Sequence, residues 1–367
     1  MSSEFLWYLP NTVEPGHRGD TATTDDGYGS LDHHVDLAQR VEDHGWAGAL
    51  LGTSWGRPDT FTVAASITAR TTTFNPLIAI RPGYWRPAHF ASAAATLDQL
   101  SGGRVRVNIV SGQDNLHQYG DVEGDQAQRY ARTKEFMRLV RRLWTEEEVT
   151  FEGEHFSVRG STVSPRPVAR DGRPHPRLYF GGASEPAERV SATESDVQLF
   201  WGEPLDGVGE RIERLRGLEQ SLGRDLPPLE FGLRITTLVR DTREEAWRDA
   251  EEKVAAMASA AEHGDRKLFQ RPGFRATGQQ RLLDLAERGE VLDSCLYTAP
   301  GKYGGGGAGT TWLVGSAEDV AGALRAYEEL GVTHFVLSDT PYRTEIARVG
   351  DGVLPLLRTP ALVGQPA

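Results

Sequence analysis

The sequence has few of the residues that build disulfides, zinc sites and basic surfaces. It contains one cysteine, Cys295, so no intramolecular disulfide can form, and no Cys/His group has the spacing of a zinc site. Acidic residues outnumber basic ones by 52 to 40, and the net charge of -12 opposes binding to nucleic-acid phosphates. We therefore expect neither a metal nor a nucleic-acid partner.

Long apolar runs are also missing. No stretch approaches the length of a membrane span, and the N-terminal Met1-Ser2-Ser3-Glu4 lacks the basic segment of a signal peptide. Together with the single cysteine, this favours a cytoplasmic protein that does not enter membranes. The hydrophobic content of 38% is still enough for a large core.

Short apolar runs alternate regularly with amphipathic segments. Eight of these runs predict strands: Phe5 to Leu9, Ala47 to Leu51, Leu77 to Ile80, Val105 to Val110, Leu178 to Phe180, Val197 to Phe200, Phe231 to Val239 and His334 to Leu337. The segments between them have helical spacing, and Thr242 with Glu245 and Ser316 with Asp319 have the spacing of capping boxes. Alternating strands and helices predict one α/β domain over residues 1–367, a parallel (β/α)8 TIM barrel. A doubly wound sheet is the alternative.

Two segments interrupt the alternation. Val149 to Val158 is predicted to form a hairpin around Glu152-Gly153. Residues 262–311, after the seventh strand, are rich in charge, Gly and Pro around one short helical segment, Gln279 to Glu287. We expect this insertion to act as a mobile lid.

Several predicted strands end abruptly in small polar residues, which is typical of strands that deliver a ligand-binding loop. Gly181-Gly182-Ala183-Ser184 precedes a helix, where free N–H groups and the helix dipole favour an anion; Ser184 could instead be an ordinary N-cap. Asn108 could pair its amide with a planar heterocycle or with a neighbouring strand. Trp201 could line a cavity or pack in the core. Arg129-Tyr130 opens a helix where both side chains could close on a phosphate.

These segments together resemble the flavin-dependent luciferase-like monooxygenases, most closely the alkanesulfonate monooxygenase branch. The similarity extends over nearly the whole chain and is carried by collinear segments: Phe5 to Pro10, Ala64 to Ser66, Ala95 to Arg104, Asn108 to Gly112, Tyr179 to Ser184, Trp201 to Pro204, Gly306 to Thr310 and Phe335 to Ser338.

The resemblance implies a barrel enzyme that uses reduced FMN (FMNH2), supplied by a separate NAD(P)H-dependent flavin reductase. The reduced flavin reacts with O2 through a flavin hydroperoxide or peroxide to oxygenate a small organic substrate. It also implies a homodimer or homotetramer. The residues that match the cofactor-binding positions of the family are Ser54, Asn108, Ser111, Arg129, Tyr130, Gly182, Ala183 and Ser184. Arg234 matches an active-site arginine, and Trp201 would line the active-site cavity.

Five substrate-facing positions depart from the sulfonate pattern. Arg57 replaces a cysteine, Thr236 a histidine, Thr340 and Tyr342 a tyrosine and a histidine, and Gly305 an arginine, which leaves Lys302 as the nearest cation. We therefore expect a substrate other than a simple alkanesulfonate. The candidate substrate residues form an aromatic and cationic set: Trp55, Arg57, Tyr84, Trp85 and Tyr342, with Arg81 as a further cation.

The catalytic candidates are Arg234, Trp201 and His17. His17 is predicted to lie on the loop after the first strand and is a candidate acid or base. Three alternatives to the leading hypothesis stay open. One is an oxidoreductase of the same superfamily that uses the deazaflavin coenzyme F420 and transfers hydride without oxygen. A second is a desulfonating alkanesulfonate monooxygenase, and the third is a flavin-binding accessory subunit without catalysis.

Overall fold

Eight parallel strands close into a barrel in the computed structural model, which describes residues 3–9, 11, 30–53, 57–112, 116–121, 125–170, 172–262, 277–303 and 310–358. Around the barrel the order is β1 (Glu4–Leu9), β2 (Gly48–Leu51), β3 (Asn75–Ile80), β4 (Arg106–Ile109), β7 (Leu178–Gly181), β8 (Val197–Trp201), β9 (Glu230–Val239) and β13 (Val332–Ser338). The pairing of β8 with β9 completes the ring. The predicted TIM barrel is confirmed, and all eight predicted strands are present.

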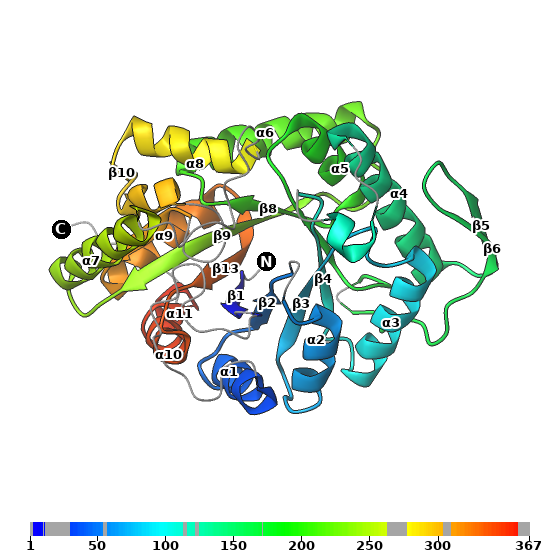
Figure 1. Ribbon diagram of the computed structural model, residues 1–367, viewed down its shortest axis with the longest axis horizontal. Helices are drawn as coiled ribbons and strands as arrows, with labels where there is room; N and C mark the ends of the chain where they lie inside the picture. The colour runs from blue at the N-terminus through cyan, green and yellow to red at the C-terminus, as the bar shows by residue number, and fades with distance from the viewer. Residues whose placement is uncertain are drawn as a thin grey trace, which may run out of the picture.

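Helices surround the barrel, as Figure 1 shows. They are α1 (Leu31–Asp43), α2 (Thr60–Thr68), α3 (Pro87–Leu100), α4 (Gln126–Thr145), α5 (Glu185–Glu194), α6 (Leu205–Ser221), α7 (Arg243–Glu262), α9 (Ala317–Glu329), α10 (Tyr342–Gly352) and α11 (Leu354–Arg358). Both predicted capping boxes are formed, by Thr242 with Glu245 and by Ser316 with Asp319. None of the helices within the described ranges has the length and apolar character needed to cross a bilayer.

Apolar side chains fill the space on both sides of the barrel wall. The larger core lies between strands and helices, where Trp7, Phe180 and Phe335 are fully buried. A smaller cluster includes Leu6, Leu50, Leu77, Tyr179, Leu199 and Val336 from six different strands. Successive side chains of a strand point to opposite faces, so Leu6 and Trp7 serve different cores.

Arg104, in the Gly102-Gly103-Arg104 segment before β4, stabilises the fold. Its guanidinium is buried and donates to the carbonyl oxygens of Ser101 (2.8 Å), Phe74 (2.9 Å) and Thr68 (3.0 Å). These bonds join the ends of α2 and α3 to the start of β3. This part of the family-like pattern therefore reflects structure and not chemistry.

The amino-terminal end of the barrel is closed by charged side chains that satisfy one another. His334 lies between two carboxylates, with Nδ1 3.2 Å from Glu4 Oε2 and Nε2 2.7 Å from Glu230 Oε2. Arg106 Nε donates to Glu4 Oε1 at 3.0 Å, and the Tyr179 hydroxyl donates to Glu4 Oε2 at 3.0 Å. Each carboxylate therefore has several donors.

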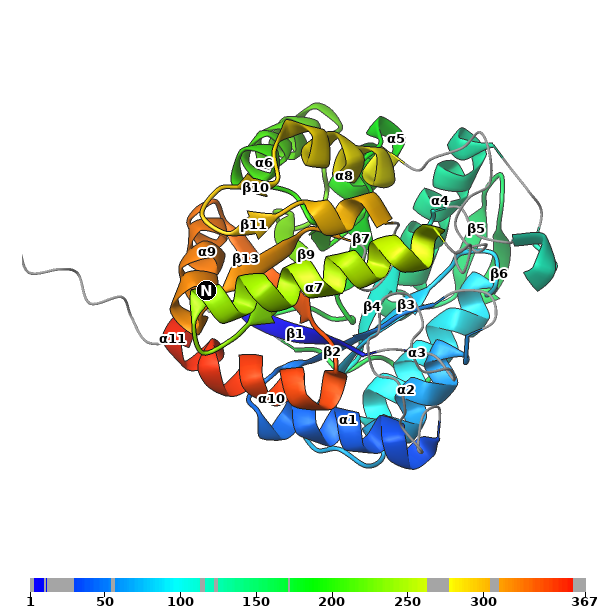
Figure 2. The ribbon, with the colours of Figure 1, turned by 60° about the vertical axis from the view of Figure 1, so that its left-hand side comes forward.

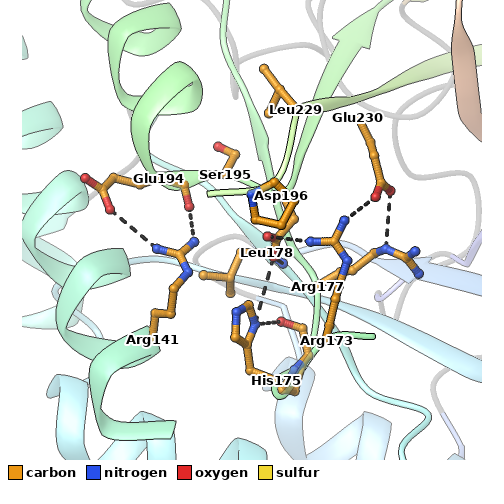
Figure 3. A network of polar contacts seen from close by, with 12 residues as sticks. Arg141, Arg173, His175, Arg177, Leu178, Glu194, Ser195, Asp196, Leu229 and Glu230 are labelled. Atoms are coloured by element: carbon orange, nitrogen blue, oxygen red, sulfur yellow. Dashed lines mark hydrogen bonds and ion pairs between the residues drawn. The ribbon is translucent and has the colours of Figure 1, made fainter. Parts of the chain in front are cut away.

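The same network continues outward between β7, β8 and β9, as Figure 3 shows. Arg173 donates to Asp196 Oδ1 at 2.8 Å and also to Glu230, which Arg177 approaches at 3.3 Å. Asp196 accepts the backbone N–H of Leu178 at 2.8 Å. These charged residues close the amino-terminal end of the barrel, and we refer to them together as the plug.

Two additions interrupt the repeat. The predicted hairpin is confirmed as β5 (Val149–Glu152) and β6 (Ser157–Ser161). The short helix η2 (Leu116–Tyr119) lies between β4 and α4. The insertion after β9 contains α8 (Thr277–Arg288), β10 (Val291–Leu292), β11 (Leu296–Tyr297) and η3 (Ala299–Tyr303), followed by β12 (Trp312–Gly315). β12 pairs with the second half of β9 and extends the sheet beyond the barrel. The lid role of residues 262–311 and the single-domain boundaries stay predictions.

Candidate functional site

A cavity of about 440 Å³ lies at the carboxyl ends of the barrel strands. Its wall includes Asn108 and the segment to Gly112 after β4, Gly181 to Ser184 after β7, and Trp201 at the end of β8. Catalytic and ligand-binding residues of TIM barrels lie at this end. The register brings Trp201 opposite Arg234, which also lines the cavity.

Five arginines and one glutamate line this cavity, in a chain whose net charge is -12. The charged lining residues are Arg57, Arg129, Arg211, Arg234, Arg281 and Glu203. The glutamate is shared between Arg211 and Arg281. A concave site with an excess of positive charge attracts anions.

One side of the cavity has the features of an anion cradle. A Cβ on Gly182 would lie 2.5 Å from the Cβ of Ala187, so only glycine fits this turn without movement. Ser184 is the N-cap residue of α5, but its side chain makes no capping bond. Its buried Oγ has no hydrogen-bond partner among the described residues. Ser184 therefore occupies the N-cap position of α5, but its hydroxyl does not cap the helix.

Arg129 and Tyr130 reach the same cradle from the first turns of α4. The Tyr130 ring packs edge-on against Phe180, with centroids 6.3 Å apart, and both Tyr130 and Gly182 line the cavity. Ser111 lines the cavity as well, and its hydroxyl lies 2.6 Å from Thr133 Oγ1 on α4. Because Thr133 donates to the Arg129 carbonyl, Ser111 helps to fix the turn that carries Arg129.

Arg211 supports the loop that contains Gly182. Its guanidinium is 1% exposed, donates to Glu188 Oε1 at 2.8 Å, and also donates to Glu203 and to the Gly182 carbonyl oxygen. The loops after β7 and β8 are therefore joined through one buried arginine.

Asn108 is part of the cavity wall and has an amide oxygen without a hydrogen-bond partner among the described residues. The residue is buried, and its Oδ1 has no hydrogen-bond partner within the described part of the chain. Buried polar atoms are nearly always paired, so such an atom beside a cavity indicates a ligand that completes the bond. The Asn108 oxygen makes no bond to a neighbouring strand within the described residues.

Arg234 lies on β9 and also lines the cavity. Its Nη2 donates to Ser338 Oγ at 3.0 Å, and its guanidinium carbon lies 5.0 Å from the centre of the Tyr8 ring. Thr236 Oγ1 is 3.3 Å from the same Ser338 hydroxyl. Burial lowers the pKa of Arg234 to about 10, so the side chain is still a cation at neutral pH. Tyr8 and Tyr342 act in the opposite direction.

The structure brings most of the predicted site residues together. Of the candidates, Arg57, Asn108, Ser111, Arg129, Tyr130, Gly182, Ala183, Ser184, Trp201 and Arg234 all line the cavity. His17, Ser54 and Trp55, with Gly305, lie outside the described residues. Among those described, no cluster of His, Cys, Asp or Glu side chains is suited to a metal ion.

Three predicted substrate residues do not line this cavity. Trp85 packs against Phe61 and Phe90, with ring centroids 5.2 and 6.1 Å apart, and Tyr84 precedes it in the same turn. Tyr342 is buried at the first position of α10 and influences Arg234 electrostatically.

The two remaining cations also act elsewhere. Arg81 donates to the Gly112 carbonyl oxygen at 2.6 Å and thereby supports the loop after β4. Lys302 is exposed on η3.

Sequence reasoning missed Tyr8, Glu203, Arg211 and Arg281 as parts of the site. Tyr8 and Glu203 fall within family-like segments, which was a usable signal. Arg211 and Arg281 lie on charged helices where nothing distinguishes them from solvated arginines.

The barrel and its cavity define a TIM-barrel protein with a concave, arginine-rich site at the carboxyl ends of its strands. The family model for luciferase-like monooxygenases matches residues 3–334, and the chain belongs to this family of oxygen-incorporating enzymes. The expected family and enzyme class are thus confirmed.

Solved structures share the fold at low sequence identity. A riboflavin lyase with modified FMN and riboflavin is 21% identical with a TM-score of 0.74, over 98% of this chain and 92% of that one. EDTA monooxygenase from Chelativorans sp. BNC1 is 17% identical with a TM-score of 0.75, over 97% and 93%. An F420-dependent secondary alcohol dehydrogenase is 16% identical with a TM-score of 0.69, over 98% and 100%.

Proposed function

We propose that this protein is an FMN-dependent monooxygenase that oxygenates a small organic substrate. FMN is to be delivered in its reduced form by a separate NAD(P)H-dependent flavin reductase, with O2 as co-substrate. The observation that carries the proposal is the cavity itself, where an unpaired Asn108 amide oxygen and an anion cradle at Ser184 face the same space. The FMN-containing riboflavin lyase of the same fold supports it.

The residues of the cavity fit the parts of FMN. Gly182, Ala183 and Ser184 at the start of α5, with Arg129 and Tyr130 from α4, would hold the phosphate through N–H, hydroxyl and guanidinium donors. Asn108 would pair with the polar edge of the ring, and Trp201 would form a wall of the site. When bound in its reduced form, the flavin supplies the electrons and the reactivity toward O2.

Arg234 would supply positive charge where an oxygen-derived anion or an anionic substrate lies. A buried cation in a cavity interacts with a nearby anion far more strongly than it would in water. Arg57 on the same wall donates to the Asn11 carbonyl at 3.1 Å and would add to this field. The cytoplasmic location, the homodimer or homotetramer, and a substrate other than a simple alkanesulfonate are further parts of the proposal.

The proposal is tested by titrating the purified protein with FMN and with reduced FMN, followed by single-turnover mixing with O2 and a panel of substrates. The expected result is saturable FMN binding, and a product that carries one atom from labelled O2. Absence of FMN binding at millimolar concentration would rule the function out.

A deazaflavin-dependent oxidoreductase is the second candidate, because the F420-dependent dehydrogenase covers this chain as completely as the flavin enzymes do. Competition between FMN and the deazaflavin coenzyme distinguishes the two. Preference for the deazaflavin and turnover without O2 would reverse the order of the candidates.

A further inference from the structure

A second cavity, of about 320 Å³, lies beside the first between α6 and α8. Figures 1 and 2 show α8 next to α6 on the outside of the barrel. Two residues, Glu203 and Arg281, line both cavities. Their side chains form an ion pair, with Arg281 Nη2 2.7 Å from Glu203 Oε2. The ion pair therefore lies where the two cavities adjoin.

The two partners of this pair are held very differently. The Glu203 side chain is 3% exposed, its carboxylate also receives Arg211, and its backbone carbonyl accepts the Tyr327 hydroxyl at 2.8 Å. Arg281 projects from α8 and its side chain is 31% exposed. Glu203 is thus the fixed partner, and Arg281 is the one that can swing into solvent, since the buried Glu203 carboxylate would keep Arg211 as its partner.

Helix α8 also covers Trp201. A Cβ on Gly278 would lie 3.3 Å from the indole ring, and Thr277, Gly278 and Gln279 line the main cavity. Leu282 is buried beneath the helix. An outer ion pair between Arg288 and Asp206 holds the other end of α8. Both residues line the second cavity and not the first.

We infer that the Arg281–Glu203 ion pair is a gate between the flavin cavity and the cleft between α6 and α8, with Arg281 as its moving part. This inference rests on the proposed function. With the pair closed, water and small solutes in the cleft are kept from the flavin, which protects reactive species from side reactions. With Arg281 swung out, the two cavities join and solutes pass between them. Arg281 is a positioning residue and takes no part in bond making.

The gate also connects to the phosphate cradle. Glu203 binds Arg211, and Arg211 binds the Gly182 carbonyl oxygen and Glu188 of α5. Three polar contacts, through Glu203 and Arg211, therefore connect Arg281 to the loop that would hold the FMN phosphate. Because the Glu203 side is anchored, loss of Arg281 should open the gate without dismantling the cradle.

The test compares Arg281→Ala with Arg281→Lys and with Arg288→Ala, the matched control that removes the outer ion pair of the same helix. Access to bound FMN is measured by fluorescence quenching with a neutral nitroxide, which needs no turnover. In Arg281→Ala we expect the quenching constant to rise about fivefold, which corresponds to about 1 kcal/mol of lost ion-pair energy. The Kd for FMN should stay within about threefold of the wild type.

A second measurement follows the electrons. Reduced FMN that reacts with O2 without oxygenating substrate gives oxidised FMN and H2O2, so the ratio of H2O2 to product reports leakage. This ratio should rise severalfold in Arg281→Ala, recover at least in part in Arg281→Lys, and stay at the wild-type level in Arg288→Ala.

The outcomes separate the inference from the function. Wild-type protein that does not bind FMN overturns the proposed function. Normal FMN binding with unchanged quenching and unchanged H2O2 ratio in Arg281→Ala overturns the gate alone. An equal change in Arg288→Ala also overturns the gate, because the effect would then come from general loosening of α8.

Discussion

The two ends of the barrel use polar side chains in opposite ways. At the amino-terminal end, Glu4 and Glu230 each have several donors, and His334 lies between them. At the carboxyl end, Asn108 Oδ1 and Ser184 Oγ are buried beside a cavity and have no partner in the described part of the chain. The closed end uses polar groups for stability, and the open end keeps them for a ligand.

The largest effect is expected at the closed end. In Glu4→Ala the side chains of Arg106, His334 and Tyr179 lose a shared partner whose side chain is only 16% exposed. Breaking such a network by removing one member typically costs about 3–5 kcal/mol. The free energy of unfolding, measured with urea, should fall by that amount, whereas FMN affinity of the folded fraction should not change.

A glutamate on the hairpin provides the control for this prediction. Glu152 pairs with Arg159, but both side chains are largely exposed, at 63% and 83%. Exposed pairs contribute little, so Glu152→Ala should change the unfolding free energy by less than about 0.5 kcal/mol. Equal losses in Glu4→Ala and Glu152→Ala would contradict the structural role of the plug.

The second prediction concerns Asn108 at the open end. In Asn108→Leu the amide is replaced by an apolar group of similar size, so two hydrogen bonds to the ring are lost. At about 1 kcal/mol each, FMN should bind about thirtyfold more weakly in equilibrium titration. Stability should stay the same or rise, because an unpaired buried oxygen is removed. A destabilised variant with normal FMN affinity would show that Asn108 belongs to the core.

The third prediction compares two serines at helix N-termini. Ser30 accepts the backbone N–H of His33 at 3.1 Å, whereas Ser184 makes no capping bond. Ser30→Ala should therefore cost about 1 kcal/mol of stability and leave FMN binding unchanged. Ser184→Ala should leave stability unchanged and weaken FMN binding about tenfold, the value of one hydrogen bond to a charged group. Riboflavin, which lacks the phosphate, should bind the Ser184 variant as it binds the wild type.

Much of the fold could be predicted from the sequence, because buried parallel strands are short apolar runs. Each of the eight barrel strands coincides with such a run. The elements that were missed have weaker signals. β10 and β11 are two residues long and show no periodicity. Helix α4 begins at Gln126, three residues before the Arg129-Tyr130 pair that was predicted to open it, because its first residues are polar and exposed. The helices α10 and α11 after the last strand were not predicted at all.

The open end was more predictable than the side chains that support it. Asn108 and Ser184 stand out because polar or small residues interrupt apolar runs at strand ends. Arg211 and Arg281 could not be found, since burial of an arginine on a charged helix depends on tertiary contacts. The aromatic pair Tyr84 and Trp85 suggested a pocket, but the ring of Trp85 packs against Phe61 and Phe90. Composition does not tell whether an aromatic side chain lines a cavity or a core.

The last prediction is a pH dependence of stability that originates at the closed end. Burial alone would lower the pKa of His334, but hydrogen bonds to Glu230 and Glu4 raise it above the ordinary 6.5. Burial alone would raise the pKa of Glu230, but its bonds to His334 and the nearby arginines lower it to about 2. The same kinds of contact hold the pKa of Glu4 well below its usual range, against the effect of burial.

The raised pKa of His334 and the lowered pKa values of the carboxylates predict losses at the upper and the lower end of the pH range. The contribution of His334 to the free energy of unfolding is fully present below pH 6.5, and it is lost as the pH rises through the raised pKa of His334. Stability from the carboxylates is complete above about pH 4.5 and declines as the pH falls toward 2. Each loss is at most about 1.4 kcal/mol for every unit of pKa shift. Urea midpoints measured from pH 3 to 9 should therefore be highest between the two limits, and His334→Gln should remove the decline on the alkaline side. An alkaline decline that persists in His334→Gln would place its origin in another group and separate the plug from the pH response.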